Sequence, residues 1–408
     1  MALFSISFLY KIDINNENYI DITFLKRILY LSLFPLLFLS ISWRNVKFEL
    51  FGYSILSWNL IHIFLFFYAD KNLNYLLRVL QATLVYLLVI YFSQTKIVLN
   101  VKIKNFLNVI VFIVTAALVF FAFVNINVAE NIYNGFGGNR VFFSIWLTQL
   151  IFFILYSNVT LFEAKKKADL LIISKCFITI IPIFLLQILT SGRIGLLVSF
   201  CILNYYLIIL FRLNFSKSLL FIVGFLCFTL AFDHFSPITR IHNETFITRG
   251  IKVPTEIIRA TGNKSLALNP YKIIDTATSH RLSILVSGVK NESLVSLKEF
   301  LFGVGIEKAE ATAETQVYGS YRPHNIYLNH LMEIGIFALL SLLCIVTLPF
   351  FSKEAVKTNK EKILFFIVIS WSLFIANLQP ELLLSQVSSS IAYWFAYGIF
   401  LRKRFCKY

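Results

Sequence analysis

Residues 322–335 read RPHNIYLNHLMEIG, and this stretch joins the longest polar segment of the chain to a strongly apolar run. The Pro-His-Asn step in it places a titratable imidazole, His324, at the boundary between polar and apolar sequence. The polar segment reaches back to about residue 235, and apolar runs fill most of the chain on both sides of it. This alternation predicts a helical membrane protein with one large segment outside the membrane.

The composition supports this prediction, because 58% of the 408 residues are hydrophobic and only 14% are charged. A helix needs roughly 20 apolar residues to cross about 30 Å of hydrocarbon, and it satisfies its own backbone there. We predict an all-α integral membrane protein with about 11–12 transmembrane helices and one large, partly helical outer loop. The expected spans are 28–43, 51–68, 74–93, 106–124, 142–162, 172–190, 194–211, 218–234, 334–351, 363–379 and 381–401.

Basic residues in the short connectors indicate the orientation, because Lys and Arg favour the cytoplasmic side. They occupy every second connector, which places residues 235–325 outside and the carboxyl-terminal tail inside. Eleven spans leave the amino terminus outside, together with Lys26 and Arg27, and a shallow or re-entrant element within residues 1–24 would bring the number of membrane elements to twelve. The sequence thus divides into an amino-terminal bundle of about eight spans (1–234), a large outer loop (235–325) and carboxyl-terminal helices with a basic tail (326–408). The connectors contain Arg44, Lys47, Lys96, Lys102, Lys104, Lys165, Lys166, Lys167, Arg212, Lys217, Lys353, Lys357, Lys360, Lys362, Arg402, Lys403 and Arg404.

Several function classes are disfavoured by the sequence. The net charge of +16 lies in connectors between apolar runs, so we expect no nucleic-acid partner. The five cysteines form neither a disulfide framework nor a paired metal-ligand spacing. There is no nucleotide-binding phosphate loop and no Asp-x-Asp pair. We therefore expect an enzyme without a metal ion or cofactor, acting from outside on a lipid-anchored activated substrate.

Three residues are the main candidates for chemistry. His324 can act as a general base, since an imidazole titrates near neutral pH. Arg193, in Ser191-Gly192-Arg193, and Arg281 can each bind a phosphate, for which the forked guanidinium is well suited. Each has a simpler interpretation: a histidine bonded to local backbone at a helix start, an interfacial arginine and a solvated surface charge.

Four further residues are candidates for substrate binding. Arg322 lies two positions from His324, and Asn325 can orient His324 or the substrate. Arg140 follows a glycine-rich outer turn that can hold a phosphate, although such a stretch is more often only a flexible turn. Glu333 is costly so close to the membrane unless it has a partner, and we expect it to brace its helix rather than transfer a proton.

The order of these features resembles the superfamily of bacterial O-antigen ligases and O-antigen or capsule polymerases. The matching features are Ser191-Gly192-Arg193 opening a span, Arg281 in the loop, Gly303-Val304-Gly305, and His324-Asn325-x-x-Leu328 with Glu333-x-Gly335. They cover roughly residues 135–345, and the amino-terminal third matches only in hydropathy. The family motif often has Ser and Arg adjacent, whereas here Gly192 intervenes.

The resemblance implies a multi-pass protein of the bacterial inner membrane, with a periplasmic loop and a periplasmic active site. It implies that Arg281 and Arg193 grip an undecaprenyl-pyrophosphate-linked glycan and that His324 activates the acceptor hydroxyl. In a polymerase the acceptor is a second glycan repeat unit, and in a ligase it is the lipid A core. The form of the His324 motif favours a polymerase. Membrane lipid and a chain-length regulator are the other expected partners. A third interpretation of the sequence, from a different class of function, is a transporter such as a lipid-linked glycan flippase.

Overall fold

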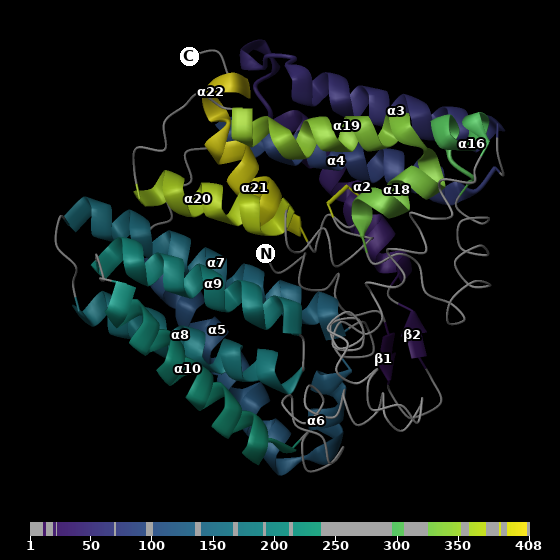
Figure 1. The fold of residues 1–408 in the computed structure, drawn as a ribbon. Coiled ribbons are helices and arrows are strands. Elements are labelled where there is room, and N and C mark those ends of the chain that lie inside the picture. The colour runs from purple at the N-terminus through teal and green to yellow at the C-terminus, as the bar shows by residue number, and fades with distance from the viewer. Residues whose placement is uncertain are drawn as a thin grey trace, which may run out of the picture. The chain divides into compact units, whose positions relative to one another are not determined.

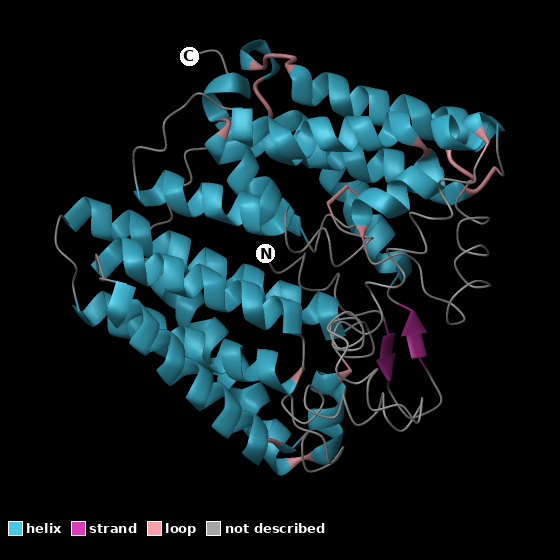
Figure 2. Ribbon diagram, in the orientation of Figure 1, coloured by secondary structure: helices cyan, strands magenta, loops and turns pink. Residues whose placement is uncertain are grey.

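The computed structural model describes residues 11–13, 19–21, 23–68, 71–94, 101–134, 140–165, 170–190, 193–211, 215–237, 296–305, 325–351, 359–372, 383–384 and 390–405. These residues are predominantly helical, as predicted (Figure 2). One feature departs from the all-α prediction, a short antiparallel hairpin of β1 (Lys11–Asp13) and β2 (Tyr19–Asp21) with Ile12 opposite Ile20. The hairpin was missed because three residues are too few for a period-two pattern to stand out.

Packing divides the chain into two compact units that are each assembled from separated segments. The first unit comprises Met1–Ser32, Thr95–Ile247 and Val356–Ile367, and the second comprises Leu33–Gln94, Thr248–Ala355 and Val368–Tyr408. The three consecutive segments predicted from the sequence are a division by topology, whereas these units are a division by packing. The elements not yet assigned to a bundle are α2 (Thr23–Ser40), the 3-10 turn η1 (Trp43–Asn45) and α20 (Asn359–Ser370).

The first unit is a helical bundle in which α7 packs against both α8 and α9, and α5 packs against α8 (Figure 1). Apolar side chains such as Ile151, Leu155 and Leu186 are fully buried between these helices. These side chains fit closely together, and their many van der Waals contacts hold the helices of the bundle against one another. The helices are α5 (Val101–Val124), α6 (Ile126–Tyr133), α7 (Arg140–Lys165), α8 (Leu170–Leu189), α9 (Arg193–Phe211) and α10 (Phe215–Phe235).

In the second unit α3 packs against α4 and α19, and α21 packs against α4 (Figure 1). An aromatic cluster of Phe51, Trp394, Tyr397 and Phe405 fills one end of this unit, with ring centroids 5.2–6.4 Å from that of Phe51. The elements are α3 (Leu50–Tyr68), α4 (Leu73–Gln94), α16 (Leu297–Phe302), α18 (Ile326–Ile334), α19 (Ile336–Thr347), η2 (Leu348–Phe351), α21 (Ile391–Phe400) and α22 (Arg402–Phe405).

Among the described residues, three helices are long and apolar enough to cross a membrane: α3, α4 and the part of α5 from Asn105 to Val124. Each of the other predicted spans overlaps a described helix, so the hydropathy pattern located the helices well. For these other helices a complete membrane crossing stays a prediction.

Candidate functional site

The amino-terminal end of α18 is built by Asn325. Its backbone is extended, with φ −138° and ψ 120°, and its Oδ1 accepts hydrogen bonds from the amides of Tyr327 and Leu328, each at 3.0 Å. Asparagine is favoured at this position because its side chain satisfies amides that lack a partner within the helix. Asn325 therefore has a structural role, because its side-chain oxygen caps the helix. Its role in orienting His324 or the substrate stays a prediction.

The other end of α18 is joined to the segment that follows α16. The amide of Val304 donates to the carbonyl of Met332 at 2.8 Å, and the amide of Gly305 donates to the carbonyl of Glu333 at 3.2 Å. Carbonyls in the last turn of a helix have no partner within it, so these bonds satisfy groups that would otherwise lack a hydrogen-bond partner. We call this contact between residues 303–305 and 332–335 the glycine clasp.

The glycine clasp depends on two glycines. Gly303 has φ 76° and ψ 172°, and Gly335 has φ 82° and ψ −177°, a region of backbone conformation that is essentially restricted to glycine. A Cβ atom added to Gly303 would overlap the carbonyl group of Glu333, and one added to Gly335 would overlap the carbonyl group of Leu301. The close backbone approach explains why both positions carry glycine.

Glu333, in the last turn of α18, forms a buried ion pair with Arg78 of α4. The Nη1 atom of Arg78 lies 2.6 Å from Oε2 of Glu333, and the two side chains are 12% and 0% exposed. Arg78 thus supplies the partner that a carboxylate in such surroundings requires. The sequence offered one signal for it, an arginine within an otherwise apolar helix, which is rare unless the residue is paired or functional.

Two histidines and a tryptophan lie beside this ion pair. The indole ring of Trp58 lies 4.4 Å from the ring of His62 and 4.9 Å from the ring of His330, measured between centroids. Nδ1 of His62 lies 2.8 Å from the carbonyl oxygen of Trp58 and donates to it, which leaves Nε2 as the unprotonated nitrogen. All three side chains are almost completely buried.

Burial lowers the pKa of His330 to about 3, and the positive charge of nearby Arg78 acts in the same direction. His330 is therefore uncharged at neutral pH, and the cluster formed by Trp58, His62, Arg78, His330 and Glu333 contains one positive and one negative charge. A protonated imidazole here would be a second buried cation beside Arg78, and the pKa of His330 falls because that state is unfavourable.

This pKa predicts a loss of stability in acid. Between the ordinary pKa of 6.5 and the folded value of about 3, the unfolded chain binds a proton at position 330 that the folded chain does not. Stability is therefore expected to fall as the pH is lowered from about 6.5 towards 4. The charged and titratable groups facing His330 are Arg78 from α4, His62 from α3 and Glu333 from α18 itself.

The measurement is thermal unfolding of the detergent-solubilised protein at pH 7 and at pH 5. His330→Phe retains an aromatic ring beside Trp58 but cannot titrate, so its melting temperature is expected to change less between the two pH values than that of the wild type. His234→Phe, at an exposed position, is the control and keeps the wild-type profile. An equal pH dependence in His330→Phe and the wild type would contradict the prediction.

A second set of polar contacts, in the first unit, holds the start of α9. Nε2 of Gln187 lies 2.7 Å from Oγ of Ser199, 3.0 Å from Oγ1 of Thr148 and 3.1 Å from the carbonyl oxygen of Ser144. The hydroxyl of Thr148 lies 3.0 Å from the carbonyl oxygen of Gly195, to which it can donate. Because these groups are buried, their mutual hydrogen bonds fix how α7, α8 and α9 fit together.

The network bears on Arg193, which is the first residue of α9. Gly195 lies two positions along the same helix, and a Cβ atom there would overlap the hydroxyl of Ser144. The start of α9 is thus packed directly against α7. Arg140 is likewise the first residue of its helix, α7, and the side chains of both arginines lie outside the described residues.

The remaining predicted site residues, His324, Arg322 and Arg281, lie outside the described residues. Of the predicted set, the structure joins Asn325 and Glu333 through one helix, α18. The residues that sequence reasoning missed are Arg78 and Trp58, together with the part played by His62. Among the described residues, no group of three or more His, Cys, Asp or Glu side chains could hold a metal ion.

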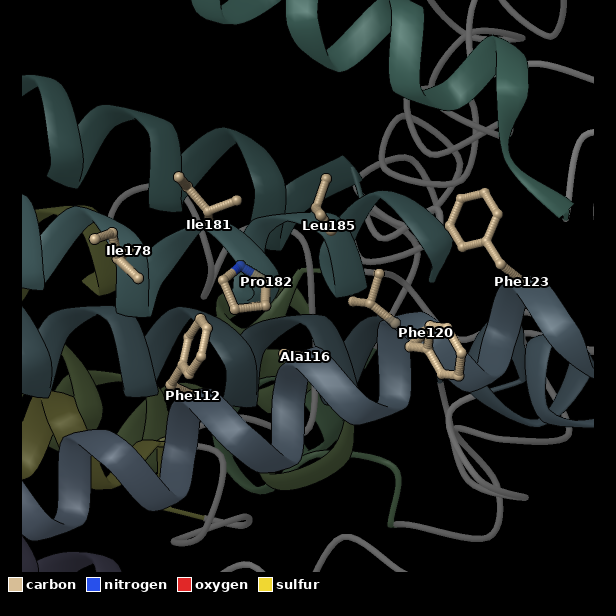
Figure 3. Close-up of a pocket in the computed structure, with 9 residues that line it drawn as sticks. Phe112, Ala116, Phe120, Phe123, Ile178, Ile181, Pro182 and Leu185 are labelled. Atoms are coloured by element: carbon tan, nitrogen blue, oxygen red, sulfur yellow. The ribbon is translucent and has the colours of Figure 1, made fainter.

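An apolar groove of about 480 Å³ lies between α5 and α8 in the first unit (Figure 3). It lies beside Pro182, a residue that removes one backbone hydrogen bond within α8. No lining side chain can transfer a proton or bind a phosphate, so the groove suits a hydrocarbon chain and not the reacting groups. The lining residues are Phe112, Ala116, Val119, Phe120, Phe123, Ile178, Ile181, Pro182 and Leu185.

Comparison with known proteins adds no further constraint on this site. No family model matches the chain, and no curated protein matches it significantly.

Proposed function

We propose that this chain is a membrane glycosyltransferase, an O-antigen or capsule polymerase of the bacterial inner membrane. In the proposed reaction, a hydroxyl of one lipid-linked repeat unit attacks the anomeric carbon of a glycan carried on undecaprenyl diphosphate. The bond from that carbon to the diphosphate oxygen breaks, and undecaprenyl diphosphate leaves. A single displacement of this kind inverts the anomeric configuration.

Each proposed site residue has one role. His324 accepts the proton of the attacking hydroxyl as the new glycosidic bond forms. Arg193 and Arg281, assisted by Arg322, neutralise the negative charge that develops on the leaving diphosphate. Asn325 begins α18 directly after His324 in the sequence, and no metal ion or cofactor has a role in this scheme.

The observation that carries the proposal is the glycine clasp. Gly303-Val304-Gly305 and Glu333-x-Gly335 are two of the short features on which the resemblance rests, and they are about 30 positions apart in the sequence. Short motifs can occur in the expected order by chance. Their direct backbone contact at the end of α18 supports the interpretation that they form one functional unit.

The proposed membrane arrangement has 11–12 crossings, with the large loop in the periplasm, as the distribution of basic connectors favours. Within the part of the chain that the structure describes, three helices are long and apolar enough to cross a membrane, which supports the membrane placement. The donor and acceptor are both anchored in the membrane, so a periplasmic active site at its surface would meet them there.

The experiment is a gel of lipopolysaccharide from a strain that lacks the gene, complemented with the wild-type gene or with His324→Ala. We expect the wild type to restore the ladder of long chains and His324→Ala to leave core carrying a single repeat unit. His234→Ala, at an exposed histidine on α10, is the matched control and is expected to restore the ladder. Equal amounts of each protein in the membrane fraction exclude a defect in expression.

Two other outcomes would change the assignment. Bare core, with polymer accumulating on the lipid carrier, would identify a ligase that transfers polymer to the lipid A core. A normal ladder from His324→Ala at wild-type abundance would contradict the glycosyltransferase proposal.

A lipid-linked glycan flippase is the second candidate, and one observation favours it. The Arg78–Glu333 pair is buried among helices, two of which, α3 and α4, are long and apolar enough to cross a membrane, and charged groups in such positions often line transport pathways. If the chain is a flippase, lipid-linked repeat units would accumulate on the cytoplasmic face of the inner membrane in the strain lacking the gene. Substitution of Arg78 or Glu333 would abolish function, and His324 would be dispensable.

A further inference from the structure

We propose that Arg78 is a positioning residue for the reaction, acting through Glu333 on the placement of α18. The inference rests on the proposed function, because the position of α18 matters only if residues at its amino-terminal end serve the reaction. Arg78 lies far from every predicted site residue in the sequence, and it is connected to them only through the fold.

The helix α18 is too short to hold its place by itself. The helix spans nine residues, Ile326–Ile334, and helices this short are marginal in isolation. Its place must therefore come from contacts with the rest of the second unit. The hydroxyl of Tyr327 donates to the carbonyl of Ser372 at 3.0 Å near one end, and Glu333 pairs with Arg78 near the other.

Glu333 occupies an unfavourable position within α18. A carboxylate in the last turn lies at the negative end of the helix dipole, where it is unfavourable. At this end of α18 the carboxylate of Glu333 does not favour helix formation, and the side chain is also fully buried. The ion pair with Arg78 offsets both costs, so the carboxylate is better explained as an anchor to α4.

The ion pair also restricts the direction of α18 relative to α4. The pair joins a side chain in the first half of α4 to one at the end of α18, at 2.6 Å between nitrogen and oxygen. The neighbouring His330 is uncharged and its ring lies against Trp58, so within this cluster Arg78 is the cation that holds the carboxylate. A forked guanidinium fixes the direction of its partner more closely than an ammonium group does. Loss of this constraint would let α18 rotate or slide, and Asn325 at its other end would move with it.

The experiment separates positioning from simple neutralisation of a buried charge. The double variant Arg78→Met/Glu333→Gln removes both charges and retains similar side-chain volumes, so it is expected to reach the membrane at wild-type abundance. Arg78→Lys retains the charge but not the fork. Arg44→Met is the matched control, because Arg44 is exposed in the 3-10 turn η1.

Activity is measured with purified protein in liposomes that contain lipid-linked repeat units extracted from the strain lacking the gene. We expect the double variant to lose at least about tenfold in kcat with little change in KM, since misplacing a site by about 1 Å can cost a hundredfold. Arg78→Lys is expected to lie between the double variant and the wild type. Arg44→Met is expected to match the wild type.

Two results would overturn the inference: wild-type kcat in the double variant, or a fall in activity that only matches a fall in folded protein. His324→Ala is assayed in parallel. If His324→Ala is inactive while the double variant is fully active, the positioning role fails and the proposed function stands. If His324→Ala is fully active, the proposed function fails, and the positioning role fails with it.

Discussion

Replacing Gly335 with alanine is expected to remove most of the folded protein from the membrane. The backbone there has φ 82° and ψ −177°, which alone costs a residue with a side chain on the order of 1–3 kcal/mol. The added Cβ atom would also overlap the carbonyl group of Leu301 and lie 2.6 Å from the amide nitrogen of Gly303. These are backbone atoms, which cannot move aside as the end of a flexible side chain can.

The total cost for Gly335→Ala is expected to be about 2–6 kcal/mol, from strained conformation and overpacking together. Membrane domains with a stability similar to that of soluble ones, about 5–15 kcal/mol, would lose a large share of it. The measurements are thermal unfolding in detergent and abundance in the membrane fraction. Gly303→Ala is expected to behave alike, because its Cβ atom would overlap the backbone of Glu333 across the same clasp.

Gly224→Ala is the matched control for the glycine clasp. A Cβ atom added to Gly224 meets nothing within 4 Å, and the residue lies inside α10. Alanine is a better helix former than glycine by about 1 kcal/mol, so this variant is expected to be at least as stable as the wild type. If Gly335→Ala proved as stable as Gly224→Ala, the close packing of the glycine clasp would be contradicted.

Gly195→Leu is expected to lower stability by a similar amount, by separating α9 from α7. A Cβ atom at Gly195 would overlap the hydroxyl of Ser144 and lie 2.7 Å from the carbonyl carbon and oxygen of the same residue. The displaced helix would lose the hydrogen bond from Thr148 to the Gly195 carbonyl and disturb the contacts of buried Gln187. Overpacking and unsatisfied buried polar groups together are expected to cost on the order of 3–5 kcal/mol.

Two further variants test the cause of that effect, with thermal unfolding in detergent as the measurement. Ser144→Ala combined with Gly195→Ala removes the overlapping hydroxyl but not the backbone contact, so stability is expected to stay well below that of the wild type. Leu197→Ala, at a position 55% exposed on the same helix, is expected to have little effect. Full recovery in the double variant would show that only the hydroxyl, and not the backbone, limits the approach of α9.

The hydropathy pattern predicted the helices because it is a local property of the sequence. The predicted spans 142–162 and 194–211 correspond to helices that begin at Arg140 and Arg193. The start of α18 was also accessible to sequence reasoning, since Asn325 follows a proline-containing step and asparagine is a favoured capping residue. The motif order suggested a function, which remains the proposal made above.

The short helices between the long apolar helices were harder to predict. The sequence predicted only that the large loop is partly helical, whereas α16 is a distinct helix with a capping box between Ser296 and Glu299. Helices of six to nine residues contain too few turns for periodicity to identify them, and their stability depends on the elements that they contact.

By itself, the sequence determined the helical class, the positions of the long helices and the capping of α18, because these follow from residues near one another in the chain. Only the tertiary structure decided that Arg78 pairs with Glu333, that Gly303 meets Gly335 and that Gln187 joins three helices. A buried charge or polar group requires a partner, but its own sequence neighbourhood does not specify which one. That choice depends on which helices pack together, and packing depends on the fit of whole surfaces rather than on any local pattern.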